Sequence, residues 1–198
     1  MTDADKRDKI IAAAYTVLSE KGYDKASTKE IASTAGVAQG LINYYFSSKD
    51  LLFAEVFRRQ TERFCASFDH LIPNTATSLT REAIGELLEA SKKKVIEDVD
   101  WFRLRYELFA IGLRNEAARE TLKVMLATER KHISDKIAKL SGLPPEQATL
   151  FASIFYSVFQ GLGLQEITDP DFKYDETYEM VGDMYNAFYE QLTEKREP

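Results

Sequence analysis

The chain has 198 residues, of which 44% are hydrophobic and 29% are charged, and its formal net charge is −6. This composition is typical of a folded protein with one or two small domains. No apolar run reaches the roughly 20 residues that span a bilayer, and the first ten residues lack the apolar core of a signal peptide. The single cysteine, Cys65, cannot form an internal disulfide. We therefore expect a cytoplasmic protein that does not enter a membrane.

The charge is unevenly distributed along the chain. Residues 1–50 carry seven basic and seven acidic side chains, whereas the remaining residues carry 19 basic and 25 acidic ones. A neutral N-terminal segment permits binding to a polyanion, and the absence of a strongly basic face predicts modest non-specific affinity.

Apolar residues recur three and four positions apart along most of the chain, and strand-like alternation is missing, so we predict an all-α fold. The first helix is expected over about 5–21, ending at Gly22. A second begins at Ser27, where a Ser-x-x-Glu spacing predicts a capping box, and ends near Gly36. A third, short helix is expected over about 38–46.

Longer helices are predicted downstream. Ser47 and Asp50 repeat the capping spacing and begin a helix that should reach about His70, before a polar loop at 73–78. The remaining helices are expected at about 79–97, 100–112, 115–140, 146–167 and 172–194. The prediction is therefore a fold of about nine helices.

The two short helical patterns within residues 27–52 meet at a glycine-containing turn. An exposed helix with short polar side chains fits the major groove, so this layout is typical of a helix-turn-helix DNA reader. The outward residues of the third helix are predicted to be Gln39, Gly40, Leu41, Asn43, Tyr44 and Tyr45. Gln and Asn can pair with adenine, while the backbone near Thr28 and the ammonium groups of Lys29 and Lys49 suit phosphates. A capped three-helix bundle with the two tyrosines packed inside is the alternative.

Residues 22–52, GYDKASTKEIASTAGVAQGLINYYFSSKDLL, resemble the N-terminal head of the tetracycline-repressor (TetR) family. The resemblance implies a three-helix bundle with a helix-turn-helix at residues 1–46. An effector-binding and dimerisation domain would follow at 47–198, with the fourth helix as the connector. It further implies a homodimer that represses transcription from a double-stranded palindromic operator until a small-molecule effector releases it.

The resemblance also assigns roles within the head. Thr28, Lys29 and Lys49 would contact phosphates. Bases or backbone would be contacted by Gln39, Gly40, Leu41, Asn43 and Tyr45. The sequence departs from the family at Asn43, where tyrosine is usual, and at Ala38, where Ser or Thr often caps the reading helix.

Aromatic residues are concentrated in the segment 100–113, which together with nearby apolar positions predicts a small-molecule pocket. The predicted lining is Phe64, Phe68, Trp101, Phe102, Tyr106, Glu107, Phe109 and Met125. Ordinary core packing is the alternative for any single residue. Glu107 would suit a cationic ligand, whereas Arg103 or Arg105 would suit a carboxylate, so the sequence leaves the effector's charge open.

The last two helical segments carry large apolar side chains at heptad-like spacing. Two such helices from each subunit could form a four-helix dimer interface. The predicted interface is Phe151, Phe155, Phe159, Leu162, Tyr178, Val181, Tyr185 and Phe188. Either stripe could instead be internal core, and both uses can coexist.

Catalytic patterns are weak in this sequence. Cys65 and Asp69 would share a helix face, but His70 lies about 100° further round. His70 and His132 lack metal-ligand spacing, and neither a phosphate loop nor a dinucleotide fingerprint is present. We therefore expect no enzyme activity, no metal and no cofactor. The alternatives to an effector-released repressor are a DNA-binding dimer without an effector and a helical adaptor protein.

Overall fold

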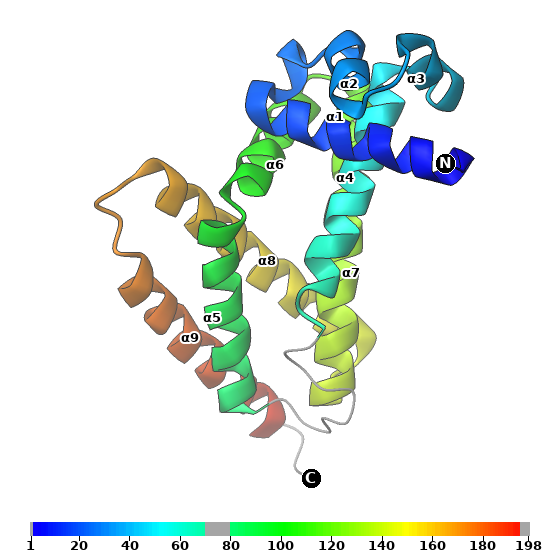
Figure 1. Cartoon of the computed structure of the whole chain (residues 1–198). Coiled ribbons are helices and arrows are strands. Elements are labelled where there is room, and N and C mark those ends of the chain that lie inside the picture. The colour runs from blue at the N-terminus through cyan, green and yellow to red at the C-terminus, as the bar shows by residue number, and fades with distance from the viewer. Residues whose placement is uncertain (1, 70–79, 195–198) are drawn as a thin grey trace. The chain divides into compact units, whose positions relative to one another are not determined.

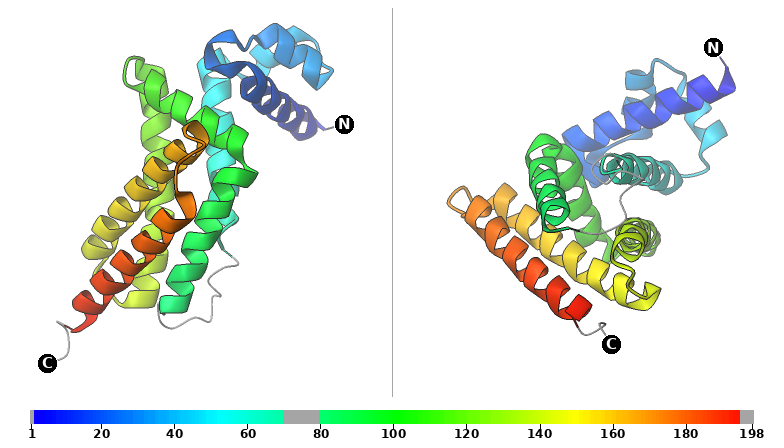
Figure 2. Two further views of the ribbon diagram at one scale, coloured as in Figure 1. Left: turned by 90° about the vertical axis from the view of Figure 1, so that its left-hand side faces the viewer. Right: turned by 90° about the horizontal axis from the view of Figure 1, so that it is seen from below.

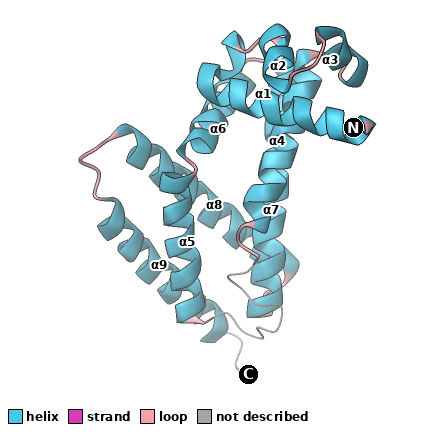
Figure 3. Ribbon diagram, in the orientation of Figure 1, coloured by secondary structure: helices cyan, strands magenta, loops and turns pink. Residues whose placement is uncertain are grey.

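The computed structural model describes residues 2–69 and 80–194 (Figure 1). Within these ranges the chain forms nine α-helices and no strand, which confirms the all-α prediction (Figure 3). The helices are α1 (Asp3–Lys25), α2 (Thr28–Ala35), α3 (Gln39–Tyr45), α4 (Lys49–Ala66), α5 (Arg81–Glu97), α6 (Val99–Gly112), α7 (Glu116–Ser141), α8 (Pro145–Thr168) and α9 (Tyr174–Glu194). None of these described helices combines the length and apolar character that crossing a membrane requires.

The chain divides into two compact units. The first comprises Met1–Phe64 and Asp100–Thr128, and the second comprises Cys65–Val99 and Glu129–Pro198. The first unit therefore holds the N-terminal helices with most of α6, and the second holds α5, α8 and α9.

Local capping interactions set the ends of the N-terminal helices. The Thr2 side chain accepts a hydrogen bond from the Asp5 backbone, and the Asp5 carboxylate accepts one from the Thr2 backbone. Ser27 forms the predicted capping box at the start of α2, and Gly36 ends that helix in the left-handed conformation with φ 66°. Gly22, at φ 77°, interrupts the helical geometry of α1 where the sequence predicts its end.

The predicted cap of α4 is shifted by one residue. The Leu51 backbone N–H donates to Ser48 Oγ at 3.2 Å, so Ser48 rather than Ser47 caps the helix. Asp50 instead accepts a hydrogen bond from the Tyr23 hydroxyl at 2.5 Å. The helix ends at Ala66, before the predicted end at His70, which lies outside the described residues together with the predicted loop at 73–78.

The core of the head is built from isoleucine and leucine side chains of α1, α2 and α3. Ile10, Leu18, Ile31 and Ile42 are each at most 1% exposed. Burying one such side chain contributes about 1.5–3 kcal/mol, so these contacts fix the angle between the two short helices. This packing holds α3 in place while leaving its opposite face free.

In the second unit, α8 and α9 lie side by side, as the two views in Figure 2 show. Aromatic rings join them: Phe151 lies 5.4 Å from Tyr185 and 5.6 Å from Phe188, and Phe155 lies 5.3 Å from Tyr185, measured between ring centroids. These pairs form a continuous aromatic seam inside the unit.

Candidate functional site

The outward face of α3 carries mainly polar side chains. Gln39, Asn43 and Tyr44 are exposed, and Tyr44 has 73% of its surface in solvent, while Leu41 is half-buried. Ile42 on the opposite side anchors the helix in the core. The short helix therefore presents hydrogen-bonding groups outward on a fixed support, which is the layout that major-groove reading requires.

Gly40 has no packing role inside the protein. A Cβ atom placed on it would meet no described atom within 4 Å, and its backbone is helical. A glycine costs a helix up to about 1 kcal/mol relative to alanine. Glycine therefore lowers the stability of α3 at this position, although no contact within the protein requires it. A missing side chain on an outward face allows the backbone of another molecule to approach closely.

The start of α2 lies beside this face. The Gln39 side-chain amide donates to Thr28 Oγ1 at 3.3 Å, which links the first turns of α2 and α3. Lys29 is exposed on the next position of α2. Three of the predicted contact residues are thus gathered at the two adjoining helix starts.

Two predicted contact residues also have partners within the protein. The Tyr45 hydroxyl donates to the Asp3 carbonyl at 3.2 Å, and this side chain is half-buried. The Lys49 ammonium donates to the Tyr23 carbonyl at 2.8 Å and lies over the rings of Tyr23 and Phe53. Both residues therefore brace the head as well as standing near its outer face.

Tyr23 joins the head to α6. Its backbone N–H donates to Glu107 Oε1 at 2.8 Å, and the same carboxylate packs against Gly22, where an added Cβ would come within 2.7 Å of it. Burial and the hydrogen bond to Asp50 raise the pKa of the Tyr23 hydroxyl. The structure therefore places Glu107, a predicted pocket residue, at the turn that ends the regular part of α1.

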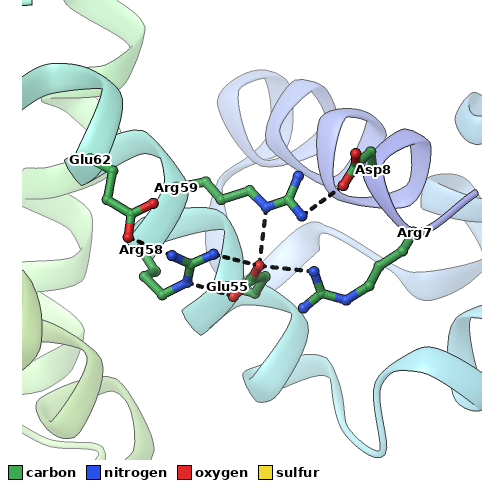
Figure 4. Close-up of polar contacts among 6 residues, drawn as sticks. All are labelled: Arg7, Asp8, Glu55, Arg58, Arg59 and Glu62. Carbon is green, nitrogen blue, oxygen red and sulfur yellow. Dashed lines mark hydrogen bonds and ion pairs between the residues drawn. The ribbon is translucent and has the colours of Figure 1, made fainter. Parts of the chain in front are cut away.

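A charged network ties α1 to α4 (Figure 4). Glu55 accepts from Arg58 at 2.8 Å and from Arg59 at 3.0 Å, and pairs with Arg7 of α1 at 3.1 Å. Arg59 also pairs with Asp8 at 2.7 Å. Hydrogen bonds from Arg58 are the main reason that the pKa of Glu55 falls from 4.5 to about 2.

Replacing Glu55 with glutamine is expected to lower the free energy of unfolding at pH 7 by about 1–2 kcal/mol, since the network is partly exposed to solvent. The folded-state pKa lies below the unfolded one, so this stabilisation is complete above about pH 4.5 and is lost as the pH falls towards 2. The free energy of unfolding would be measured by urea unfolding at a series of pH values. Between pH 4.5 and 2 it should fall less steeply with decreasing pH for E55Q than for wild type. The control is Glu62→Gln, because the Glu62 side chain is 56% exposed. If the free energy of unfolding depended on pH equally in wild type and E55Q, the prediction would be contradicted.

The predicted effector residues on α6 form a buried aromatic cluster in the first unit. Trp101 and Phe102 are 4% and 0% exposed, whereas Tyr106 and Phe109 are half-buried. The fully buried Arg105 guanidinium lies 4.9 Å from the Phe64 ring centroid and 5.2 Å from that of Phe102. The sequence indicated Arg105 only as a possible partner for a carboxylate ligand. Its cation–π contacts with these rings were not predicted.

The other predicted pocket residues and charges are more dispersed. Met125 lines a groove beside α4, and Phe68 belongs to the second unit. Arg103 is 64% exposed and pairs with Asp100 at 3.4 Å, so it lies at the surface.

The head sequence matches a known family. The sequence model described as "Bacterial regulatory proteins, tetR family" matches residues 10–56, which include α2, α3 and the start of α4. This head therefore carries the sequence pattern of the TetR family. The N-terminal part of the chain is 51% identical over 51 residues to the HTH-type transcriptional regulator YvdT of Bacillus subtilis, a match that covers 26% of each chain.

A longer match is to the HTH-type transcriptional activator FasR of Mycolicibacterium smegmatis, with 26% identity over 148 residues. It covers 75% of this chain and 66% of FasR, so the matches to YvdT and FasR span less than two thirds of either relative. These relatives are named as transcriptional regulators and not as enzymes, as the sequence predicted.

Solved structures share the fold along nearly the whole chain. A transcriptional regulator from Pseudomonas aeruginosa PAO1 superposes with a TM-score of 0.77 at 21% identity, covering 100% of this chain and 96% of that one. A regulator from Saccharomonospora viridis in complex with choline superposes with a TM-score of 0.71 at 19% identity, and the match covers 93% of this chain and 97% of that one. At these identities the likeness shows the fold alone, and this shared fold extends through α9.

Most of the predicted dimer residues are buried inside the second unit. Five are at most 8% exposed, two are half-buried and Phe188 is 43% exposed. The fully buried members are Phe151, Phe159, Leu162, Tyr178 and Tyr185. The same two helices expose other apolar side chains, namely Leu150, Ile154, Leu164, Met180 and Met184.

Proposed function

We propose that this protein is a homodimeric transcriptional repressor that binds a palindromic DNA operator and is released from it by a small-molecule effector. Residues 1–46 would form the DNA-binding head, and 47–198 the effector-binding and dimerisation domain. The observation that carries the proposal is the outward face of α3, where exposed polar side chains surround a glycine without an internal packing role.

Asn43 and Gln39 would read bases, because their amides offer the donor and acceptor pair that adenine presents in the major groove. Leu41 would contact a thymine methyl, and Gly40 would allow the closest backbone approach. Thr28, Lys29, Tyr44 and Tyr45 would bind phosphates around them. Lys49 has three donor hydrogens, so it can hold the Tyr23 carbonyl and still reach a phosphate.

Dimerisation would use the exposed apolar residues of α8 and α9, while the aromatic seam between the two helices keeps each subunit's surface rigid. Leu150, Ile154, Met180 and Met184 have between 54% and 67% of their surface in solvent. Exposed apolar clusters of this kind are typical of protein interfaces. A two-fold dimer would place two reading helices on half-sites about 34–36 Å apart, or a multiple of that distance.

The effector would bind against the aromatic residues of α4 and α6, with Phe64, Trp101, Phe102, Tyr106 and Phe109 forming its apolar wall. The regulator from Saccharomonospora viridis shows that a protein of this fold can hold a small molecule. Trp101 is the single tryptophan of the chain, so its fluorescence reports on this region. A hundredfold loss of operator affinity on effector binding requires about 2.7 kcal/mol of coupling.

Selection of bound duplexes from a random DNA pool at fixed salt tests the proposal, and enrichment of a palindrome is the expected result. Asn43→Ala should then weaken binding to the selected operator about tenfold and relax preference at one base pair in each half-site. The matched control is Gln191→Ala, an exposed polar residue of α9. Failure of a folded dimer to enrich any sequence would instead favour an adaptor function.

A further inference from the structure

The Glu107 carboxylate of α6 contacts the head at the break in α1. Gly22 has φ 77° and ψ 172°, so the helical geometry is interrupted directly before Tyr23. The Tyr23 backbone N–H donates to Glu107 Oε1 at 2.8 Å, across 84 positions of the chain. A charged acceptor makes this hydrogen bond stronger than one between neutral groups. Glu107 therefore holds the backbone in place where α1 is interrupted.

Tyr23 in turn holds the start of α4. Its carbonyl accepts a hydrogen bond from Lys49 Nζ at 2.8 Å, and its hydroxyl donates to Asp50 Oδ1 at 2.5 Å. The Lys49 ammonium also lies 5.5 Å from the Tyr23 ring centroid and 5.0 Å from that of Phe53. These two rings pack edge to face at 4.9 Å between centroids. One hydrogen bond and two aromatic rings thus fix the position of the lysine ammonium.

A fixed lysine is suited to phosphate binding. The lysine side chain has a flexible four-carbon stem, and ordering it on a ligand costs conformational entropy. Lys49 is already ordered by Tyr23 in the protein without DNA, so this cost is reduced when a phosphate binds. Lys29, the other lysine predicted to contact a phosphate, is exposed on α2 and lies outside this set of contacts.

We infer that Glu107 is a positioning residue for DNA binding, which acts through Tyr23 to hold the Lys49 ammonium where it meets a DNA phosphate. Two of the three donor hydrogens of Lys49 remain for the phosphate oxygens. The inference rests on the proposed function, because it requires DNA at the head. It adds that a residue of α6, outside residues 1–46, sets one of the contacts that the head makes.

The positioning step can be tested without DNA. Acetylation of the full-length protein, followed by peptide mass spectrometry, gives the reaction rate of each lysine. Lys49 should react at least about threefold faster in Glu107→Ala, because its ammonium is released from the Tyr23 carbonyl. Glu107→Gln keeps an oxygen that can accept the Tyr23 N–H, so its Lys49 rate should stay within about twofold of wild type. Lys29 is the internal control, and its rate should not change.

A double-mutant cycle tests whether the held lysine binds phosphate. Phosphate contacts carry no sequence information, so a mixed-sequence duplex at low salt is a sufficient probe, with affinity measured by fluorescence anisotropy. Lys49→Met should weaken binding about tenfold and E107A about fivefold. The double variant K49M/E107A should bind within about twofold of K49M alone, because Glu107 acts only through Lys49. In the matched control, K29M/E107A should show the losses of both single variants in full.

The outcomes separate this inference from the proposed function. An unchanged Lys49 acetylation rate in E107A would overturn the positioning. Independent losses in K49M/E107A, with urea unfolding curves that verify folding, would show that Glu107 only stabilises the fold and would overturn its role in DNA binding. In both cases DNA binding itself would stand. A wild-type protein that bound no duplex would overturn the proposed function, and this inference with it.

Discussion

Replacing Gly22 with alanine is expected to lower the free energy of unfolding by about 2–4 kcal/mol. Gly22 has φ 77° and ψ 172°, a backbone conformation that is strained for any residue with a side chain. The new Cβ would also lie 2.7 Å from Glu107 Oε1. The flexible carboxylate can move away, but only by giving up its hydrogen bond to the Tyr23 backbone.

Two other glycines separate these contributions. Gly36 also has a positive φ, of 66°, but an added Cβ there would meet no atom within 4 Å. Gly36→Ala should therefore lower the free energy of unfolding by only about 1–2 kcal/mol. Gly85→Ala, at an exposed position in α5, should stabilise the protein by up to about 1 kcal/mol, because its Cβ meets open space. In urea unfolding, the double variant G22A/E107A should lose less free energy of unfolding than the sum of the losses of the two single variants. Equal losses for G22A and G36A would show that Glu107 does not contribute.

Replacing Gly40 with alanine is expected to change stability and DNA affinity in opposite directions. The helix should gain up to about 1 kcal/mol, because the new methyl group meets open space within the protein. Affinity for the selected operator should fall tenfold or more, since inserting a methyl group into a packed contact costs about 1–3 kcal/mol. Urea unfolding and fluorescence anisotropy at fixed salt would measure the two quantities.

Gly85→Ala is again the matched control, because it adds the same methyl group to an exposed helix outside the head. It should leave operator affinity unchanged. If Gly40→Ala bound the operator as tightly as wild type, α3 would not approach DNA as closely as proposed.

Sequence reasoning predicted the features of this fold that depend on neighbouring residues. The capping box at Ser27 and the left-handed Gly36 involve residues within one turn of each other, so their spacing identifies them. The cap at α4 was assigned to Ser47 instead of Ser48 because adjacent serines offer similar local patterns. Only the contact between Tyr23 and Asp50 shows that Asp50 is engaged elsewhere.

Contacts between distant parts of the chain could not be read from spacing. Glu107 and Tyr23 are 84 positions apart, and Lys49 and Tyr23 are 26 apart. An acidic residue among aromatic ones indicates a ligand pocket as readily as a backbone contact. Periodicity also could not separate the seam between α8 and α9 from a dimer interface, because both require a stripe of large apolar side chains.

The capping box at Thr2 has a practical consequence for purification. Thr2 and Asp5 hold the first turn of α1, and the Asp3 carbonyl is bonded to Tyr45 at the end of the proposed reading helix. An affinity tag fused before Thr2 would place foreign residues at this turn, beside the surface used in every DNA-binding assay. Tags for such assays therefore belong at the other end of the chain, or should be removed by a protease that restores the original first residues.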